Sequence, residues 1–258
     1  MPSVIAIVAH PDDIEFLFAG TLLRLGDLGW DVHYCNLCDG SKGSTTMDNR
    51  RCAEVRTEES KAACRLLNAT FYPPIYADME SIYTPANLNR VAAYVRQSRA
   101  DVVLTHSPID YMEDHEVACR LAVSAAFSHA MPNLHTDPPT ETYDHPVTVY
   151  HAQPYGNVTP MGEPVTPSYF VDTTDVIDRQ VDALACHASQ KAWLDQSQGL
   201  DSYLETMKEL AAQVGRMSGR FKYAEGWRRR NHLGFCGPND DPLLTSLGEQ
   251  VYRPQPKQ

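Results

Sequence analysis

The first half of the chain alternates between short apolar runs typical of β-strands and longer segments with the periodicity of amphipathic helices. Strands are predicted at residues 3–9, 31–38, 70–76 and 101–107, and helices at 14–29, 49–69, 85–100 and 114–130. Parallel neighbouring strands need a long crossover connection, which is usually a helix, whereas antiparallel neighbours can be joined by a tight turn. The alternation therefore predicts an α/β fold with a mostly parallel sheet and helices on both faces.

The second half of the chain is less regular, but it contains no linker that would separate a second domain. Residues 132–168 are rich in proline, threonine and aspartate around one strand-like run at 147–153, which predicts a loop-rich cap near the functional site. Helices are predicted at 171–196 and 202–219, and the last twenty residues are expected to be peripheral. We therefore expect residues 1–258 to form a single domain with a helical C-terminal part.

Charge and hydropathy limit the classes of partner. The formal charge of −11 argues against an extended nucleic-acid surface, and we interpret the basic stretch at 227–232 as a solvated helix face. No apolar run reaches the ~20 residues that cross a bilayer, and the N-terminus lacks the basic region of a signal peptide. The seven cysteines have no framework spacing, so free thiols are expected. These features predict a cytoplasmic location and leave open whether the chain forms a homo-oligomer.

The first predicted strand ends on the sequence AHPDD, in which two neighbouring carboxylates follow a buried apolar run. In parallel sheets ligands bind beyond the carboxyl ends of the strands, so this strand end is where a site is expected. His10 and Asp13 lie three residues apart on the turn, a spacing that lets an imidazole and a carboxylate converge on one point. Two adjacent aspartates repel each other, and a nearby positive charge would stabilise both. The motif therefore predicts a metal site.

A second histidine ligand is expected after the fourth strand, where His115 starts the next helix and Asp114 stands beside it. Two histidines and one carboxylate are a ligand set of catalytic zinc, and they leave one position open for water. Asp114 would support a ligand histidine from behind. The alternative is that His115 merely occupies the first turn of its helix. If Asp13 binds the metal, Asp12 faces the open position and acts as the general base.

Five segments of the chain resemble the motifs of one protein family and follow one another in the same order. They are AHPDDIEFLFAG (9–20), CDGSKGS (38–44), VRTEESKAACRLLNA (55–69), DHEVA (114–118) and the stretch 171–190, which ends in HASQ. The first is similar to the A-H-P-D-D-x-E motif of the LmbE-like or PIG-L family of zinc-dependent N-acetylglucosamine deacetylases. The others resemble the glycine-containing loop, the R-x-x-E helix, the end of the H-x-D-H motif and the H-x-S-Q segment of that family. The resemblance covers about residues 3–190.

The resemblance implies a Rossmann-like fold with one zinc ion at His10, Asp13 and His115 and a general base at Asp12. The implied reaction is metal-assisted removal of an acyl group, usually acetyl, from the nitrogen of an amino sugar or glycoconjugate. The position that matches Arg56 is a candidate for binding sugar hydroxyls; alternatively, this arginine forms a surface pair with Glu59 on the same helix.

The sequence departs from the family at one catalytic position. The family's H-x-D-H motif corresponds here to MEDH, so Met112 replaces the histidine that partners the aspartate matching Asp114 in catalysis. A thioether cannot donate a proton. His106, His151 and His187 are candidate replacements, and His151 is favoured because it is expected near the end of a strand. Each of the three could instead be a hydrogen-bonded structural histidine.

Two other functions remain open, and a third is disfavoured. An amidase that acts on a sugar-thiol conjugate would use the same residues. A catalytically reduced, metal-containing carbohydrate-binding protein would explain Met112, although a binding protein has no need of the base Asp12. A nucleotide-binding Rossmann protein is disfavoured, because the first strand leads into acids that repel phosphates and no G-x-G-x-x-G follows it.

Overall fold

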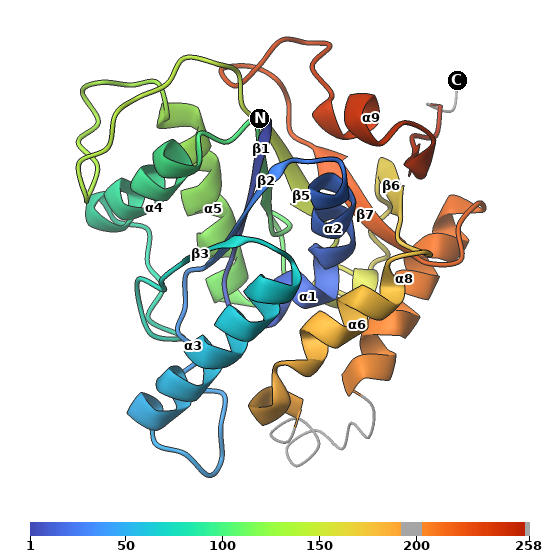
Figure 1. Ribbon diagram of the computed structural model, residues 1–258, viewed down its shortest axis with the longest axis horizontal. Helices are drawn as coiled ribbons and strands as arrows, with labels where there is room; N and C mark the ends of the chain where they lie inside the picture. Colours follow the sequence, from blue (N-terminus) through green and yellow to red (C-terminus); the bar gives the residue numbers. More distant parts are fainter. Residues whose placement is uncertain (192–202, 256–258) are drawn as a thin grey trace.

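The computed structural model describes residues 1–191 and 203–255, and its strands form one mixed sheet (Figure 1). The strands are β1 (Ser3–Val8), β2 (Asp31–Asn36), β3 (Thr70–Tyr72), β4 (Val102–Thr105), β5 (Thr148–Ala152), β6 (Tyr169–Asp172), β7 (Ala224–Arg229) and β8 (Val251–Tyr252). Their order is β3-β2-β1-β4-β5-β7-β6-β8. The first five strands in this order pair in parallel, whereas β7, β6 and β8 pair antiparallel. The predicted mostly parallel α/β fold is confirmed.

Helices cover both faces of the sheet, as predicted. One face carries α4 (Pro85–Ser98) and α5 (Glu113–Ser128); the other carries α2 (Ala19–Asp27), α3 (Asn49–Leu66), α6 (Ile177–Ala185) and α9 (Pro242–Leu247) (Figure 1). The central strand β1 is buried on both sides, because Val4, Ala6 and Val8 face one core while Ile5 and Ile7 face the other. Continuous burial explains its unbroken apolar run. No helix of the described residues is long and apolar enough to span a bilayer.

Caps fix the starts of the long predicted helices. Asp48 accepts a hydrogen bond from the Arg51 amide at 2.8 Å before α3, and Thr84 accepts one from the Asn87 amide at 3.1 Å before α4. The helix predicted at 202–219 is α8 (Tyr203–Ser218). The helix predicted at 171–196 begins later and ends earlier, as α6, because residues up to Asp172 belong to β6 and the chain leaves the helix at Cys186 and His187. Residues 192–196 lie outside the described part of the chain.

The single helix predicted at 14–29 is wrong, because it is divided at Phe18 into α1 (Asp13–Leu17) and α2. The carboxylate of Glu225 on β7 accepts hydrogen bonds from the amides of Gly20 and Thr21 at 2.7 and 2.8 Å. These amides belong to the first turn of α2, where backbone donors lack helical partners. A long-range contact therefore stabilises a second helix start that the local pattern did not indicate.

The C-terminal part is not simply helical, and the prediction of a helix face at 227–232 is wrong. Residues 224–229 form β7, which lies between β5 and β6, and Trp227 is fully buried there. The last twenty residues are also less peripheral than expected. Asp241 is buried and accepts hydrogen bonds from the hydroxyls of Tyr150 and Tyr169, both at 2.7 Å.

The expected cap at 132–168 divides into two parts, and its first part lies away from the strand ends that form the site. Tyr143 donates a hydrogen bond to the carbonyl of Ala100, directly before β4, so this loop packs at the amino ends of the strands (Figure 1). The buried guanidinium of Arg96 holds the loop and the end of α5. It donates to the carbonyl oxygens of Ser128, His129, Met131, Leu134 and Thr140.

We expect Arg96→Ala to destabilise the protein by about 2–4 kcal/mol, because several buried carbonyl groups lose their donor together. Urea unfolding would measure the change. Arg50→Ala is a suitable control, since the Arg50 side chain is 90% exposed and should change stability by less than about 0.5 kcal/mol. Equal midpoints for the two variants would contradict the anchoring role of Arg96.

Candidate active site

A cavity of about 260 Å³ opens beyond the carboxyl ends of β1 and β4. Side chains from the β1–α1 turn, α3, the start of α5 and α8 line it, so segments from the whole length of the chain meet there. His10, Asp12, Asp13, Arg56, Met112 and His115 are among the lining residues. Residue Tyr155, in the second part of the expected cap, lines it too.

Three side chains converge on one point as the sequence predicted. Ligand atoms of His10, Asp13 and His115 lie within 4.8 Å of one another, and all three residues are buried. Nδ1 of His10 is 3.5 Å from one carboxylate oxygen of Asp13, and Nε2 of His115 is 3.5 Å from the other. Imidazole nitrogens and a carboxylate at this spacing fit a zinc ion.

The remaining nitrogen of each histidine is held by a further carboxylate. Nε2 of His10 donates to Asp114 at 3.1 Å, and Nδ1 of His115 donates to Asp110 at 2.9 Å. Carboxylates in this position fix the ring orientation of metal ligands. Asp114 thus supports His10 rather than its sequence neighbour, which corrects the predicted pairing. Asp110 was missed, because its relation to His115 depends on the path of the loop after β4.

The charges of the site stabilise one another. Burial alone would raise the pKa of Asp13, but His115 and His106 hold that pKa well below its usual value. Burial likewise opposes protonation of His10, yet the hydrogen bonds with Asp114 and Asp13 raise the His10 pKa overall. The Asp114 carboxylate accepts from His10, Ser81 and the Met79 amide, which outweighs burial and lowers its pKa to about 2. Asp13 and Asp114 are therefore carboxylates at neutral pH.

Asp12 lies beside this group and has different partners. Its Oδ2 accepts hydrogen bonds from the Tyr203 hydroxyl at 2.6 Å and from the Arg56 guanidinium at 3.3 Å. Arg56 also donates to the carbonyl of Pro11 at 2.5 Å. Burial raises the pKa of Asp12, while Arg56 opposes this by stabilising the charged form. Tyr203 was not among the predicted residues, because its position in the sequence gives no sign that it reaches the first strand.

The glycine-containing loop after β2 makes room for Arg56. A Cβ atom at Gly40 would lie 2.6 Å from Cδ of Arg56, and one at Gly43 would lie 2.6 Å from its Nη1. Asp78 anchors the loop by accepting hydrogen bonds from the Gly40 and Lys42 amides. Arg56 does not pair with Glu59, because Glu59 accepts two hydrogen bonds from Ser189 instead. The alternative of a surface pair on α3 is therefore wrong.

Comparison with known proteins assigns this chain to a family. The family described as PIG-L: GlcNAc-PI de-N-acetylase matches residues 5–127, which include the candidate ligands. A diacetylchitobiose deacetylase from Thermococcus kodakarensis is 30% identical over 241 residues, which cover 87% of this chain and 82% of that protein. The chain belongs to the PIG-L family. The resemblance inferred from the motifs is confirmed.

Other relatives of this PIG-L protein include a hydratase and a second deacetylase. A 4-oxalmesaconate hydratase from Pseudomonas putida is 26% identical over 203 residues, which cover 73% of this chain and 74% of that protein. Among solved structures, the N,N'-diacetylchitobiose deacetylase from Pyrococcus horikoshii has a TM-score of 0.75 at 24% identity, covering 90% of this chain and 84% of that one. The structural match supports the fold, and the family contains deacetylases.

The histidines named as replacements for the missing family histidine do not line the cavity of this PIG-L protein. His151 donates to the carbonyl of His106 at 2.9 Å and faces Arg230, and burial lowers its pKa to about 4. The predicted placement of His151 at the site is therefore wrong. His187 is fully buried and contacts Glu15 at 3.2 Å.

His106 lies closest to the ligand group, yet it too has a supporting contact. Its ring stacks on His115 with centroids 4.0 Å apart, and its Nε2 accepts a hydrogen bond from the Ala9 amide at 2.9 Å. Met112 does line the cavity. The position where the family has a histidine thus reaches the site without a proton donor.

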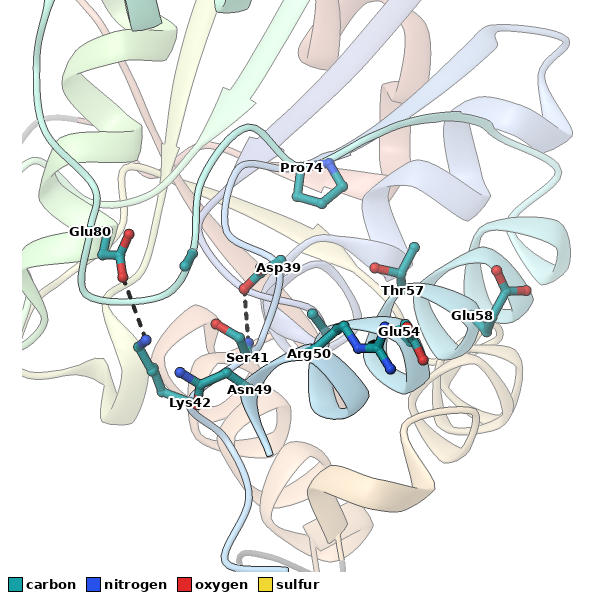
Figure 2. A pocket seen from close by; sticks show the side chains of 12 residues that line it. Asp39, Ser41, Lys42, Asn49, Arg50, Glu54, Thr57, Glu58, Pro74 and Glu80 are labelled. Atoms are coloured by element: carbon teal, nitrogen blue, oxygen red, sulfur yellow. Dashed lines mark hydrogen bonds and ion pairs between the residues drawn. The ribbon is translucent and has the colours of Figure 1, made fainter. Parts of the chain in front are cut away.

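A larger surface groove of about 670 Å³ lies next to the cavity and shares Lys42 with it. Figure 2 shows its lining, with Lys42 directed toward Glu80 and with Arg50, Glu54 and Glu58 on α3. The residues that line this groove include no histidine or cysteine, and its acids on α3 lie on a solvated helix surface. The smaller cavity is therefore the candidate active site.

We expect one divalent ion per chain, and His115→Ala should lose it because one of three ligands is removed. Asp110→Asn should keep the fold but weaken metal binding by about 10–100-fold, since the ligand ring loses its carboxylate partner. Elemental analysis and metal titration would measure both effects. His151→Ala is the matched control and should retain the ion. Unchanged metal content in His115→Ala would remove this residue from the site.

Proposed function

We propose that this protein is a zinc-dependent hydrolase that removes an acyl group, in the first place acetyl, from the nitrogen of an amino sugar or glycoconjugate. One observation carries the proposal: the side chains of His10, Asp13 and His115 lie together in a group that could hold a metal ion, while the adjacent Asp12 lines the cavity outside that group. A ligand set and a separate carboxylate base are the two parts that metal-assisted amide hydrolysis needs.

The chain's own residues would handle the protons of the reaction. When bound, the ion would polarise the acyl carbonyl and make a water molecule more acidic. Asp12 would take a proton from the attacking water, and the amine needs a proton when its bond to the acyl carbon breaks. Met112 has no proton to give, and His151 lies outside the cavity. We therefore assign both transfers to Asp12, first as base and then as acid.

The cavity walls suit a sugar ring. Phe16, Tyr111 and Tyr155 provide aromatic surfaces, and the rings of Tyr111 and Tyr155 lie 5.9 Å apart. Lys42 and Gln190 add polar groups to the same walls. A pyranose presents apolar C–H faces and a polar edge, and this mixture of side chains complements both. Because Arg56 is held by Asp12 and Pro11, its predicted contact with sugar hydroxyls becomes secondary to its support of the base.

Asp12→Asn should retain the metal and the fold but lose activity by about 10²–10⁴-fold, the contribution of a positioned general base. Acetate release from an N-acetylated amino sugar would measure activity, and elemental analysis would measure the ion. The amide is isosteric with the carboxylate and cannot accept the proton. Near wild-type turnover of the variant would place the base elsewhere.

A hydratase is the second candidate function. Two observations favour it. Met112 replaces the family's histidine, so no histidine of the motif can protonate the nitrogen that departs in amide hydrolysis. A relative that is 26% identical is named as a hydratase. The same base would add water across a carbon–carbon double bond, and the cationic Lys42 in the cavity would bind a substrate carboxylate. An amidase acting on a sugar-thiol conjugate shares the chemistry of the first proposal and differs in substrate. A carbohydrate-binding protein without activity would not need Asp12.

A substrate panel separates these functions. We expect acetate release from N-acetylglucosamine or N,N'-diacetylchitobiose, abolished by a chelator and restored by zinc. The panel should also contain an N-acylated sugar-thiol conjugate and a conjugated unsaturated dicarboxylic acid, whose hydration removes its ultraviolet absorbance. Loss of that absorbance without acetate release from any amide would favour the hydratase. Binding of sugars with no turnover of any compound would favour the binding protein.

A further inference from the structure

Tyr203 brings a hydroxyl group to the proposed base from the far end of the chain. It is the first residue of α8 and is 1% exposed, and its hydroxyl lies 2.6 Å from Oδ2 of Asp12. Its ring packs edge-on against Phe16 with centroids 5.1 Å apart, in a cluster that includes Met207 and Leu184. An apolar cluster of this kind would accept phenylalanine equally well. The hydroxyl therefore has a reason other than packing.

The two donors to Asp12 that the described residues provide are both directed at the same oxygen. Tyr203 on α8 and Arg56 on α3 both donate to Oδ2. Two donors on one oxygen fix the rotation of the carboxylate group about its bond to Cβ. The other oxygen, Oδ1, then has a defined direction.

The backbone at Asp12 supports the same interpretation. Asp12 has a φ of 91°, in the region that residues other than glycine rarely adopt, and such a conformation costs about 1 kcal/mol or more. Conformations of this kind persist where the surroundings hold them. Here Arg56 holds the preceding carbonyl of Pro11 while Tyr203 holds the side chain.

We propose that Tyr203 is a positioning residue that aligns Asp12 for proton transfer, by fixing Oδ2 so that Oδ1 is the working oxygen. This rests on the proposed function in that Asp12 is the base. Burial raises the pKa of Tyr203 well above its usual value, so the phenol keeps the proton that it donates to Asp12. Tyr203 need not touch the substrate for this role.

Tyr203→Phe removes the hydroxyl and keeps the ring, so the packing against Phe16 should survive. We expect kcat for acetate release to fall about 10–100-fold, the usual effect of removing a group that orients a functional residue. KM and metal content should stay unchanged, and the variant should remain folded at the assay temperature. Tyr94→Phe is the matched control. The Tyr94 hydroxyl donates to the carbonyl of Pro73, directly after β3, and neither residue lines the cavity, so its loss should leave kcat unchanged.

A double-mutant cycle with Asp12→Asn tests whether Tyr203 acts through the base. In the Asp12→Asn background, Tyr203→Phe should change the residual rate less than about twofold, because residues that act as a unit are not additive. A wild-type kcat for Tyr203→Phe, the full loss in both backgrounds, or a loss accompanied by lower metal content or by unfolding at the assay temperature would overturn the proposal. Full activity of Asp12→Asn alone would instead overturn the assignment of the base, and this result is visible without any change at Tyr203.

Discussion

The burial of several carboxylates at one end of the sheet is the constraint on which the site depends. Asp12, Asp13, Asp110 and Asp114 all lie where β1 and β4 end, and desolvation disfavours the charges of Asp12, Asp13 and Asp114. Every one of them has a specific nitrogen or hydroxyl partner. Asp114 holds His10, Asp110 holds His115, and Asp13 lies between these two histidines. Asp12 is held by Arg56 and Tyr203. The glycines of the loop after β2 leave room for Arg56, and α8 places Tyr203 next to Asp12.

The proposed double role of Asp12 accounts for the absence of one histidine from the family's catalytic motif. Met112 reaches the cavity in place of that histidine, and no other histidine of the described chain takes its position. Asp114 still binds His10, so the supporting contact of the motif survives even though the proton donor does not. Because both proton transfers are assigned to the Asp12 carboxylate, that carboxylate needs accurate placement. The donors that surround Asp12 supply that placement.

The second half of the chain completes a site that the first half begins. β7 lies within the sheet, and its Glu225 stabilises the start of α2; this divides the predicted helix and sets the course of the short α1 that carries Asp13. α8 packs beside α6 and delivers Tyr203. The loop at 132–147, which composition suggested as a cap, is held by Arg96 at the other end of the sheet.

The sequence by itself determined the parallel half of the sheet and the strand end where the cavity lies, because these follow from periodicity. It also predicted His10, Asp13 and His115 as metal ligands, and their side chains do lie together in the structure. Only the tertiary structure decided which carboxylate supports which histidine and which residue holds Asp12. It also showed that the basic stretch before residue 230 is a strand. Pairings such as Tyr203 with Asp12 join segments about 190 residues apart, and no local pattern encodes a contact that arises from the packing of separate helices and strands.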